Sequence, residues 1–334
     1  MILSVVPSLT WPVARCLKRA GGSSTVLGWH ALSPMNLTGD CRGYIQWLGL
    51  HKTDGRLDHA ALEQVRETCR KNAIDVVLAA DYDTTLLLAE CRDDATIPTS
   101  ALPDADMIVT LNNKWNFSSL LDRLGLPYPQ SEHIGSEQDL LATKLDFPII
   151  TKPLDMWASV GFEIHRTRAD LAATVKKGKL KSGFPLIAQR YVPGWDVGAS
   201  FLAKEGRVVA YSVFQHKKDG ERIFYDDERM HSYLEKFIEA TDYSGVGHID
   251  TRYNPELDEY RLLELNPRFW ASLLYAANAG LNYPDLLVRL EDWDKVKVRK
   301  PVPGRVKLPL YERAMTMTTR YFSTSYEKFT GAVL

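Results

Sequence analysis

Residues 2–111 alternate short apolar runs with amphipathic stretches, and this alternation limits the fold more than any other feature of the sequence. Runs at 2–6, 24–29 and 75–80 predict buried strands, whereas stretches at 11–20 and 58–71 predict helices. Strands that alternate with helices pair side by side in a parallel sheet. We therefore predict a parallel α/β domain over residues 1–111.

The first predicted strand ends at Pro7-Ser8, in the place where a Rossmann-like domain has its first turn. The glycine fingerprint G-x-G-x-x-G that binds a dinucleotide does not occur there. The domain is thus expected to be Rossmann-like in fold, and an NAD-dependent enzyme is the weakest of three functional hypotheses.

The pattern changes near residue 112 to one that mixes helices with many strands. Helices are predicted at 116–124 and 169–177, and strands at 147–152, 185–192, 197–203 and 208–214. The last three strands are predicted to form an antiparallel series, with Pro193-Gly194 and Glu205-Gly206 at the turns. A hairpin is predicted to pair 247–253 with 260–265. The proline-containing remainder, 300–334, is predicted to be a tail or a small extra element.

Composition excludes several classes of protein. With 45% hydrophobic and 25% charged residues, and Lys+Arg 41 against Asp+Glu 42, the chain resembles a soluble globular protein rather than a nucleic-acid binder. No run is long enough to predict a membrane span. The four cysteines are scattered, so neither a disulfide framework nor a zinc site is indicated, and we expect a reducing, cytoplasmic location.

The predicted hairpin carries acidic residues on both strands, Asp250 on the first and Glu264 on the second. Asn266 shares a face with Glu264, because residues two apart on a strand point the same way. Three oxygen ligands of this kind suit Mg²⁺. Acids on paired strands can also simply face solvent. The apolar neighbours of these acids favour the metal site, and by the same spacing His248 shares the face of Asp250.

These residues resemble the ATP-grasp superfamily, whose members carry an acid on one strand and Glu-x-Asn-x-Arg on the next. Gly247-His248-Ile249-Asp250 and Glu264-Leu265-Asn266-Pro267-Arg268 stand in that order. The continuation Phe269-Trp270, with Ala279-Gly280-Leu281 and Pro284, resembles the carboxylate-amine ligase-like branch.

The resemblance implies an ATP-grasp domain at 112–299, with a mobile lid at about 126–188, a hinge at 189–192 and an antiparallel-sheet subdomain at 193–299. The implied nucleotide-binding residues are Lys114, Lys152, Ser159, Gln189, Arg190, Tyr191, Val192 and Asp196. Asp196 has an equal alternative as a turn-stabilising aspartate. The chain departs from the family where a glycine-rich lid loop is usual, because Leu154 to Gly161 retains only Ser159 and Gly161 of that pattern.

The implied activity is an ATP-dependent ligation that uses Mg²⁺, with Mn²⁺ as a substitute. A small carboxylate would be activated as an acylphosphate and joined to an amine, or less readily to a thiol. Arg268 and Lys217 are the expected catalytic residues, and the metal ligands are Asp250, Glu264 and Asn266. Small amino-acid-like molecules are the expected partners, with a homodimer possible and no nucleic acid. The alternative is an ATP-binding regulatory or scaffold protein without turnover.

Overall fold

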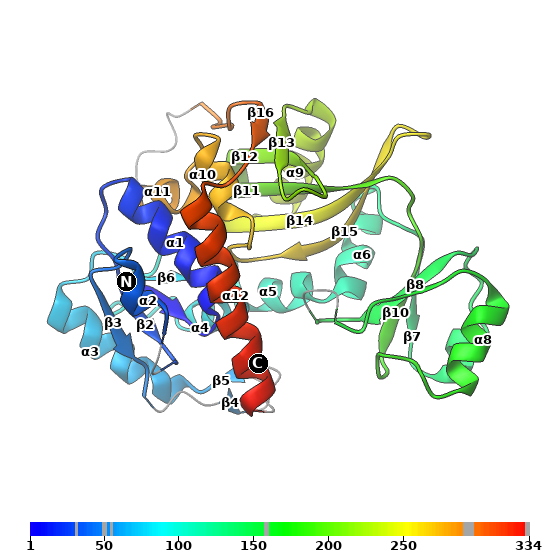
Figure 1. Ribbon diagram of the computed structural model, residues 1–334, viewed down its shortest axis with the longest axis horizontal. Coiled ribbons are helices and arrows are strands. Elements are labelled where there is room, and N and C mark those ends of the chain that lie inside the picture. Colours follow the sequence, from blue (N-terminus) through cyan, green and yellow to red (C-terminus); the bar gives the residue numbers. More distant parts are fainter. Residues whose placement is uncertain (31–32, 49–51, 54–55, 157–159, 290–296, 331–334) are drawn as a thin grey trace. The chain divides into compact units, whose positions relative to one another are not determined.

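The computed structural model describes residues 1–334 except 31–32, 49–51, 54–55, 157–159, 290–296 and 331–334 (Figure 1). Its contacts divide the chain into two compact units. Unit 1 contains Met1–Ile108, Ser200–His248 and Asn266–Leu334, and unit 2 contains Val109–Ala199 and Ile249–Leu265.

The start of unit 1 is the predicted parallel sheet, in the order β3-β2-β1-β6. Its strands are β1 (Ile2–Ser4), β2 (Thr25–Gly28), β3 (Gly43–Gln46) and β6 (Leu78–Ala79). The connecting helices are α1 (Pro7–Arg19), α2 (Met35–Thr38), α3 (Leu62–Asn72) and α4 (Tyr82–Glu90), with a short 3-10 turn (His59–Ala61) and a small β4–β5 ribbon (Lys52–Thr53, Arg56–Leu57). The sheet is parallel because each strand returns through a helix.

α1 begins four residues earlier than predicted, at Pro7, and it tolerates Pro12 in its first turns. Val6 lies in an extended conformation just before the helix, and proline is favoured at the first helical position because it has no N–H to satisfy. At the carboxyl end of β6, buried Asp81 caps α4 by accepting a hydrogen bond from the amide of Thr84. The same carboxylate accepts one from the amide of Val5 at 2.7 Å, which ties β1 to β6.

A second sheet has the order β15-β14-β11-β12-β13-β16. Its strands are β11 (Trp195–Lys204), β12 (Arg207–His216), β13 (Arg222–Tyr225), β14 (Gly245–Asn254), β15 (Glu259–Asn266) and β16 (Gly304–Val306). Strands β11, β14 and β15 each run from one unit into the other. In unit 1, α9 (Glu228–Ala240), α10 (Leu273–Asn278) and α11 (Tyr283–Val288) accompany the sheet.

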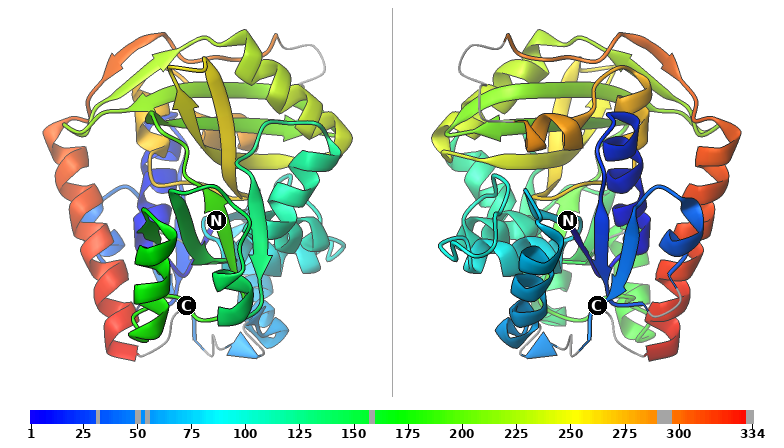
Figure 2. Two further views of the ribbon diagram at one scale, coloured as in Figure 1. Left: turned by 90° about the vertical axis from the view of Figure 1, so that its right-hand side faces the viewer. Right: turned by 90° about the vertical axis from the view of Figure 1, so that its left-hand side faces the viewer.

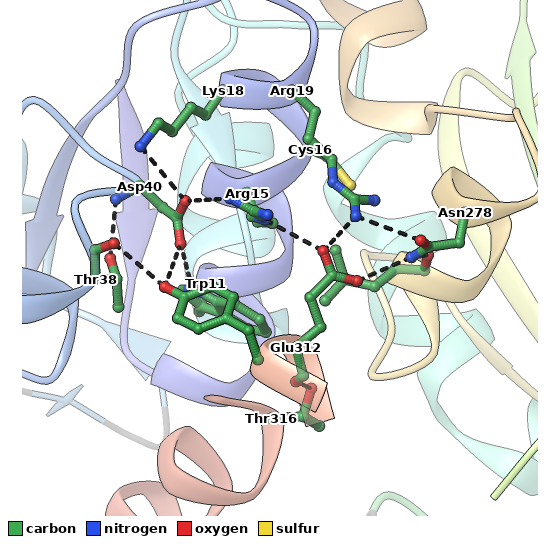
Figure 3. Close-up of polar contacts among 12 residues, drawn as sticks. Trp11, Arg15, Cys16, Lys18, Arg19, Thr38, Asp40, Asn278, Glu312 and Thr316 are labelled. Atoms are coloured by element: carbon green, nitrogen blue, oxygen red, sulfur yellow. Dashed lines mark hydrogen bonds and ion pairs between the residues drawn. The ribbon is translucent and has the colours of Figure 1, made fainter. Parts of the chain in front are cut away.

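The segment predicted as a tail or small extra element contains β16, which pairs with β13, and α12 (Leu310–Thr330). Figure 2 shows α12 in red alongside α1 in blue. The two helices are joined through Glu312, whose buried carboxylate accepts hydrogen bonds from Arg15 at 3.2 Å and Asn278 at 2.9 Å and also pairs with Arg19 (Figure 3). Arg15 also pairs with buried Asp40 at 3.0 Å.

Unit 2 contains a smaller sheet in the order β7-β10-β8-β9, which lies within the predicted lid. Its strands are β7 (Ser131–Ile134), β8 (Ile149–Pro153), β9 (Glu163–His165) and β10 (Leu186–Arg190), and its helices are α5 (Ala105–Asn112, shared with unit 1), α6 (Lys114–Arg123), α7 (Glu137–Leu141) and α8 (Arg168–Lys176). Apolar side chains of α7 and α8 pack on this sheet around Leu140 and Leu171.

One strand assignment was wrong. The strand predicted at 185–192 does not join the antiparallel series with β11 and β12, because β10 pairs instead with β7 and β8. Pro193-Gly194 is therefore a connection between sheets rather than a hairpin turn.

All four cysteines carry free thiols. Within the described ranges, helices fall short of the length and apolarity that crossing a bilayer requires.

Candidate functional site

Lys114 is held at the start of α6 by bonds of its backbone and of its side chain. Asn113 caps this helix, with its side-chain oxygen accepting hydrogen bonds from the amides of Trp115 and Asn116 at 3.1 Å. The Lys114 amide donates to the carbonyl of Leu154 at 2.8 Å, and its ammonium donates to the carbonyl of Met156 at 2.6 Å. The lysine is 5% exposed, so its charge is largely removed from water.

Lys152 lies on β8, between β10 and β9, opposite Ile187 in the pairing register. Its neighbour Thr151 points to the other face, as strand alternation requires, and its hydroxyl forms a hydrogen bond with His165 Nε2 at 3.0 Å. Lys152 is 7% exposed. The strand thus places a buried ammonium on one face and a neutral polar pair on the other.

The two lysines converge on one carboxylate. Glu264 Oε2 on β15 is 3.6 Å from Lys114 Nζ and 3.7 Å from Lys152 Nζ. Both distances exceed that of a direct hydrogen bond, so each ammonium is attracted to the carboxylate without donating to it, and the two ammonium groups repel one another. Glu264 remains partly exposed.

The electrostatic balance around Lys152 is unfavourable to its charge. Burial is the main cause that lowers the pKa of Lys152, and the neighbouring Lys114 lowers it further, whereas Glu264 and Asp250 raise it. Two buried ammonium groups with partial compensation would be stabilised by further negative charge. This arrangement fits a polyphosphate.

Asp250 on β14 and Glu264 on β15 are the two carboxylates of the predicted metal site, and both act on the charge of Lys152. In the part of the chain that the structure describes, three or more His, Cys, Asp or Glu side chains do not gather into a metal-binding group. The predicted third ligand is an amide, Asn266, which belongs to unit 1. Oxygen donors of this kind fit Mg²⁺, and the site remains a prediction.

The predicted hinge begins with Gln189, which is fully buried on β10. Its side-chain nitrogen donates to Ser131 Oγ at 2.9 Å, and its Oε1 has no hydrogen-bond partner among the described residues. The amides of Arg190 and Tyr191 donate to the carbonyls of Gln130 and Pro148. These two amides are therefore engaged in unit 2, and Val192 follows them outside the strand.

Asp196 is exposed and pairs with Arg252, whose Nη1 donates to it at 2.8 Å. Arg252 also donates to the carbonyl of Gly194 at 2.5 Å, and its guanidinium lies over the ring of Tyr191 at 5.6 Å. Asp196 thus has a role in ordering the connection after β10, which favours the turn-stabilising alternative. Ser159 lies outside the described residues.

Unit 1 holds the other predicted residues. The Arg268 side chain donates to the carbonyl of Phe269 at 2.7 Å and to Asn266 Oδ1 at 3.0 Å. Lys217 follows β12, and its amide donates to the carbonyl of Glu221 at 3.1 Å. His248 is buried, with its ring stacked on Trp270 at 5.4 Å and its Nδ1 bonded to Ser200 Oγ at 2.8 Å.

Two contacts were missed from sequence. The carbonyl of Met156 binds the Lys114 ammonium, and Arg252 organises the connection after β10. A backbone carbonyl leaves no residue-type signal in a sequence. Arg252 stands two positions after Asp250, so the alternation of the strand alone would have placed it on the same face.

Comparisons with known proteins agree with this fold. Residues 183–308 match a family model described as ATP-grasp in the biosynthetic pathway with Ter operon. The C-terminal section of the carbamoyl phosphate synthase large chain from Methanopyrus kandleri is 23% identical over 184 residues, which is 49% of this chain and 34% of that protein. D-aspartate ligase from Enterococcus faecium is 26% identical over 208 residues, covering 54% of this chain and 49% of the ligase. The chain thus spans a third to a half of these relatives.

A solved structure described as L-amino acid ligase from Bacillus licheniformis superimposes with a TM-score of 0.64 at 17% identity, covering 88% of this chain and 73% of the ligase chain. At that identity the likeness shows the fold alone. Together with the family model matched over residues 183–308 and the relatives, it supports the predicted resemblance to the ATP-grasp superfamily.

Proposed function

We propose that the chain is an ATP- and Mg²⁺-dependent ligase that activates a carboxylate as an acylphosphate and joins it to an amine. One observation carries the proposal: two buried lysines, Lys114 and Lys152, converge on Glu264 at 3.6 and 3.7 Å. Buried lysines are rare, and two with one partly exposed carboxylate leave positive charge that a polyphosphate would neutralise. The relatives named as ligases support the same reaction class.

In this proposal, Lys114 and Lys152 hold the phosphates of ATP. The unpartnered Oε1 of Gln189 is an acceptor for the exocyclic amine of adenine. Asp250, Glu264 and Asn266 would hold Mg²⁺, which when bound supplies positive charge at the phosphoryl group that is transferred.

Arg268 orients the substrate in the proposed reaction. The substrate carboxylate attacks the terminal phosphoryl group of ATP, and ADP leaves. The amine then adds to the acyl carbon, phosphate leaves, and the amine loses its proton. A guanidinium binds such oxygens through two parallel N–H groups. In the structure Arg268 donates to Asn266 Oδ1, so this bond must be exchanged when the metal and substrate bind.

The test is ADP release by purified protein with MgATP and a panel of amino acids and small carboxylates, followed by hydroxylamine trapping of the acyl group. Lys152→Ala should abolish ADP release, whereas Lys176→Ala, which changes an exposed lysine on α8, should not. Complete absence of ADP and of acyl hydroxamate across the panel contradicts a ligase.

The second candidate is an ATP-binding regulatory protein. It is favoured by the bond between the Lys114 ammonium and the Met156 carbonyl, which engages a predicted phosphate ligand in the loop that departs from the family pattern. It predicts that MgATP binds with the same dependence on Lys152, and that no substrate in the panel stimulates ADP release.

A further inference from the structure

β13 begins with an arginine, Arg222, that has no part in the proposed ligation. Its guanidinium is half-buried, with its carbon 4.7 Å from the centroid of the Tyr275 ring on α10. The Tyr275 hydroxyl donates to the carbonyl of Gly220 in the turn between β12 and β13 at 2.7 Å, which fixes the ring over the arginine. The aromatic platform therefore holds the guanidinium plane in one orientation.

Arg222 forms no ion pair within 4.0 Å among the described residues, and Asp219 is the acid that acts on its charge from farther away. Nη1 donates to the carbonyl of Glu221 at 2.9 Å, whereas Nε is buried and has no hydrogen-bond acceptor there. A buried donor without an acceptor costs free energy, so an oxygen that accepted from Nε would stabilise this site. The Nε and Nη2 groups form an edge of the guanidinium that can bind a carboxylate through two parallel hydrogen bonds.

The acids near the turn are already engaged. The Glu221 carboxylate pairs with Arg305 at 3.1 Å and with Lys307 at 3.6 Å on β16, and Asp219 accepts a hydrogen bond from the Glu221 amide. Residues 217–222 together carry three basic and two acidic side chains. Arg222 differs from Lys217 and Lys218 in being held against a ring, and Asp219 acts on its charge without forming an ion pair among the described residues.

A row of rings connects Arg222 with the segment that contains Arg268. Trp270 stacks on His248 at 5.4 Å, His248 stacks on Phe214 at 5.9 Å, and the Phe214 ring is 5.2 Å from that of His216. His216 lies directly opposite Arg222 in the β12–β13 register, and opposite residues share a face of a sheet. Arg222 therefore lies on the face of unit 1 over which the chain folds just after Arg268.

We propose that Arg222 binds a second, non-reacting carboxylate of the substrate, with Tyr275 as the platform that orients it. The assignment rests on the ligase activity proposed above and narrows its substrate to a molecule with two carboxylates or an amino acid with a free α-carboxylate. The carboxylate would accept a hydrogen bond from Nε, which has no acceptor among the described residues. Because Nε is buried, the atoms that cover it must move when the carboxylate binds.

The first experiment does not depend on turnover. Thermal unfolding is followed with succinate as a dicarboxylate probe, with inorganic phosphate, and with MgATP. Succinate should raise the midpoint of the wild-type protein but not that of Arg222→Met, whereas MgATP should raise both. Lys218→Met removes an exposed charge from the same turn and should respond to succinate as wild type does. The assignment is overturned if the wild-type midpoint responds to phosphate but not to succinate. It is also overturned if succinate raises the midpoint of Arg222→Met as much as that of wild type.

The second experiment uses ADP release with each amino acid of the panel and with its α-carboxamide. Arg222→Met should raise KM for the carboxylate form by about 10- to 100-fold with little change in kcat, since one charged bidentate contact is lost. KM for the carboxamide should not change, and Arg222→Lys should recover only part of the loss because lysine has no fork. Equal KM changes for both forms indicate a packing role and refute the proposal. Absence of ADP release in wild type contradicts the ligase instead.

Discussion

Replacement of Glu312 by alanine gives a test of how α12 is held in unit 1. The Glu312 side chain is 1% exposed, and its carboxylate contacts Arg15, Arg19 and Asn278 (Figure 3). Removal of one partner of a buried ion pair costs about 3–5 kcal/mol. The side chains of Arg15 and Arg19 are 25% and 28% exposed, so water recovers part of their solvation. We therefore expect Glu312→Ala to lose about 3 kcal/mol of unfolding free energy, near the lower end of that range.

For a folded unit of about 150–250 residues, such a loss lowers the unfolding midpoint by roughly 6–12 °C. The assay is thermal unfolding by circular dichroism, with urea titration as a second measure. Glu312→Gln keeps the shape and should lose less than alanine. Glu239→Ala, at an exposed position on α9, should stay within about 1 °C of wild type. A Glu312→Ala midpoint as close to wild type as that of Glu239→Ala would refute the reasoning.

Three further predictions concern unit 2. Lys152→Ala should weaken MgATP binding by about 10- to 100-fold in calorimetry, and an unchanged Kd would show that this lysine does not contact the nucleotide. Burial lowers the pKa of His165, so the unfolded chain binds a proton that the folded one does not as pH falls below 6.5. Stability should therefore fall on acidification from pH 7.5 to 5.5, and His165→Asn should fall less; parallel curves would contradict this. Gly194 has a φ of +105°, and an added Cβ would meet the carbonyl of Tyr253. Gly194→Ala should lower stability by about 1–3 kcal/mol in urea unfolding, more than Gly178→Ala, which meets open space.

The sequence pattern predicted the parallel sheet and the hairpin of Asp250 and Glu264 well, because burial on both faces or on one face imposes a period on the apolar residues. It did not predict that β10 belongs to a different sheet from β11. The apolar run at 185–192 is compatible with either sheet, because apolar residues indicate that a strand is buried but do not indicate which strand it pairs with. The partner is decided by long-range packing against β7 and β8.

The last helix was obscured for a different reason. Pro301, Pro303 and Pro309 lie close before it, and they indicate a break in regular structure. Exposed Leu310, Met317 and Tyr321 also blur the apolar stripe of α12. Glu312 attaches it to α1 beside the contacts of Tyr311 with Trp11 and of Ser323 with Ser8, and a buried acid looks the same in sequence as an exposed one. In the site, the positions of Lys114 and Lys152 came from family resemblance, whereas their shared carboxylate needed three-dimensional distances.

The bond between Glu312 and Arg15 also sets an order of events during synthesis. Arg15 and Arg19 belong to the first helix of the chain, and the carboxylate that both contact is supplied almost 300 residues later. A nascent chain must therefore hold α1 with these guanidiniums uncompensated by Glu312 while the intervening strands assemble. α12 belongs to unit 1, so a ribosome that stalls before Glu312 presents an incomplete unit to chaperones and proteases.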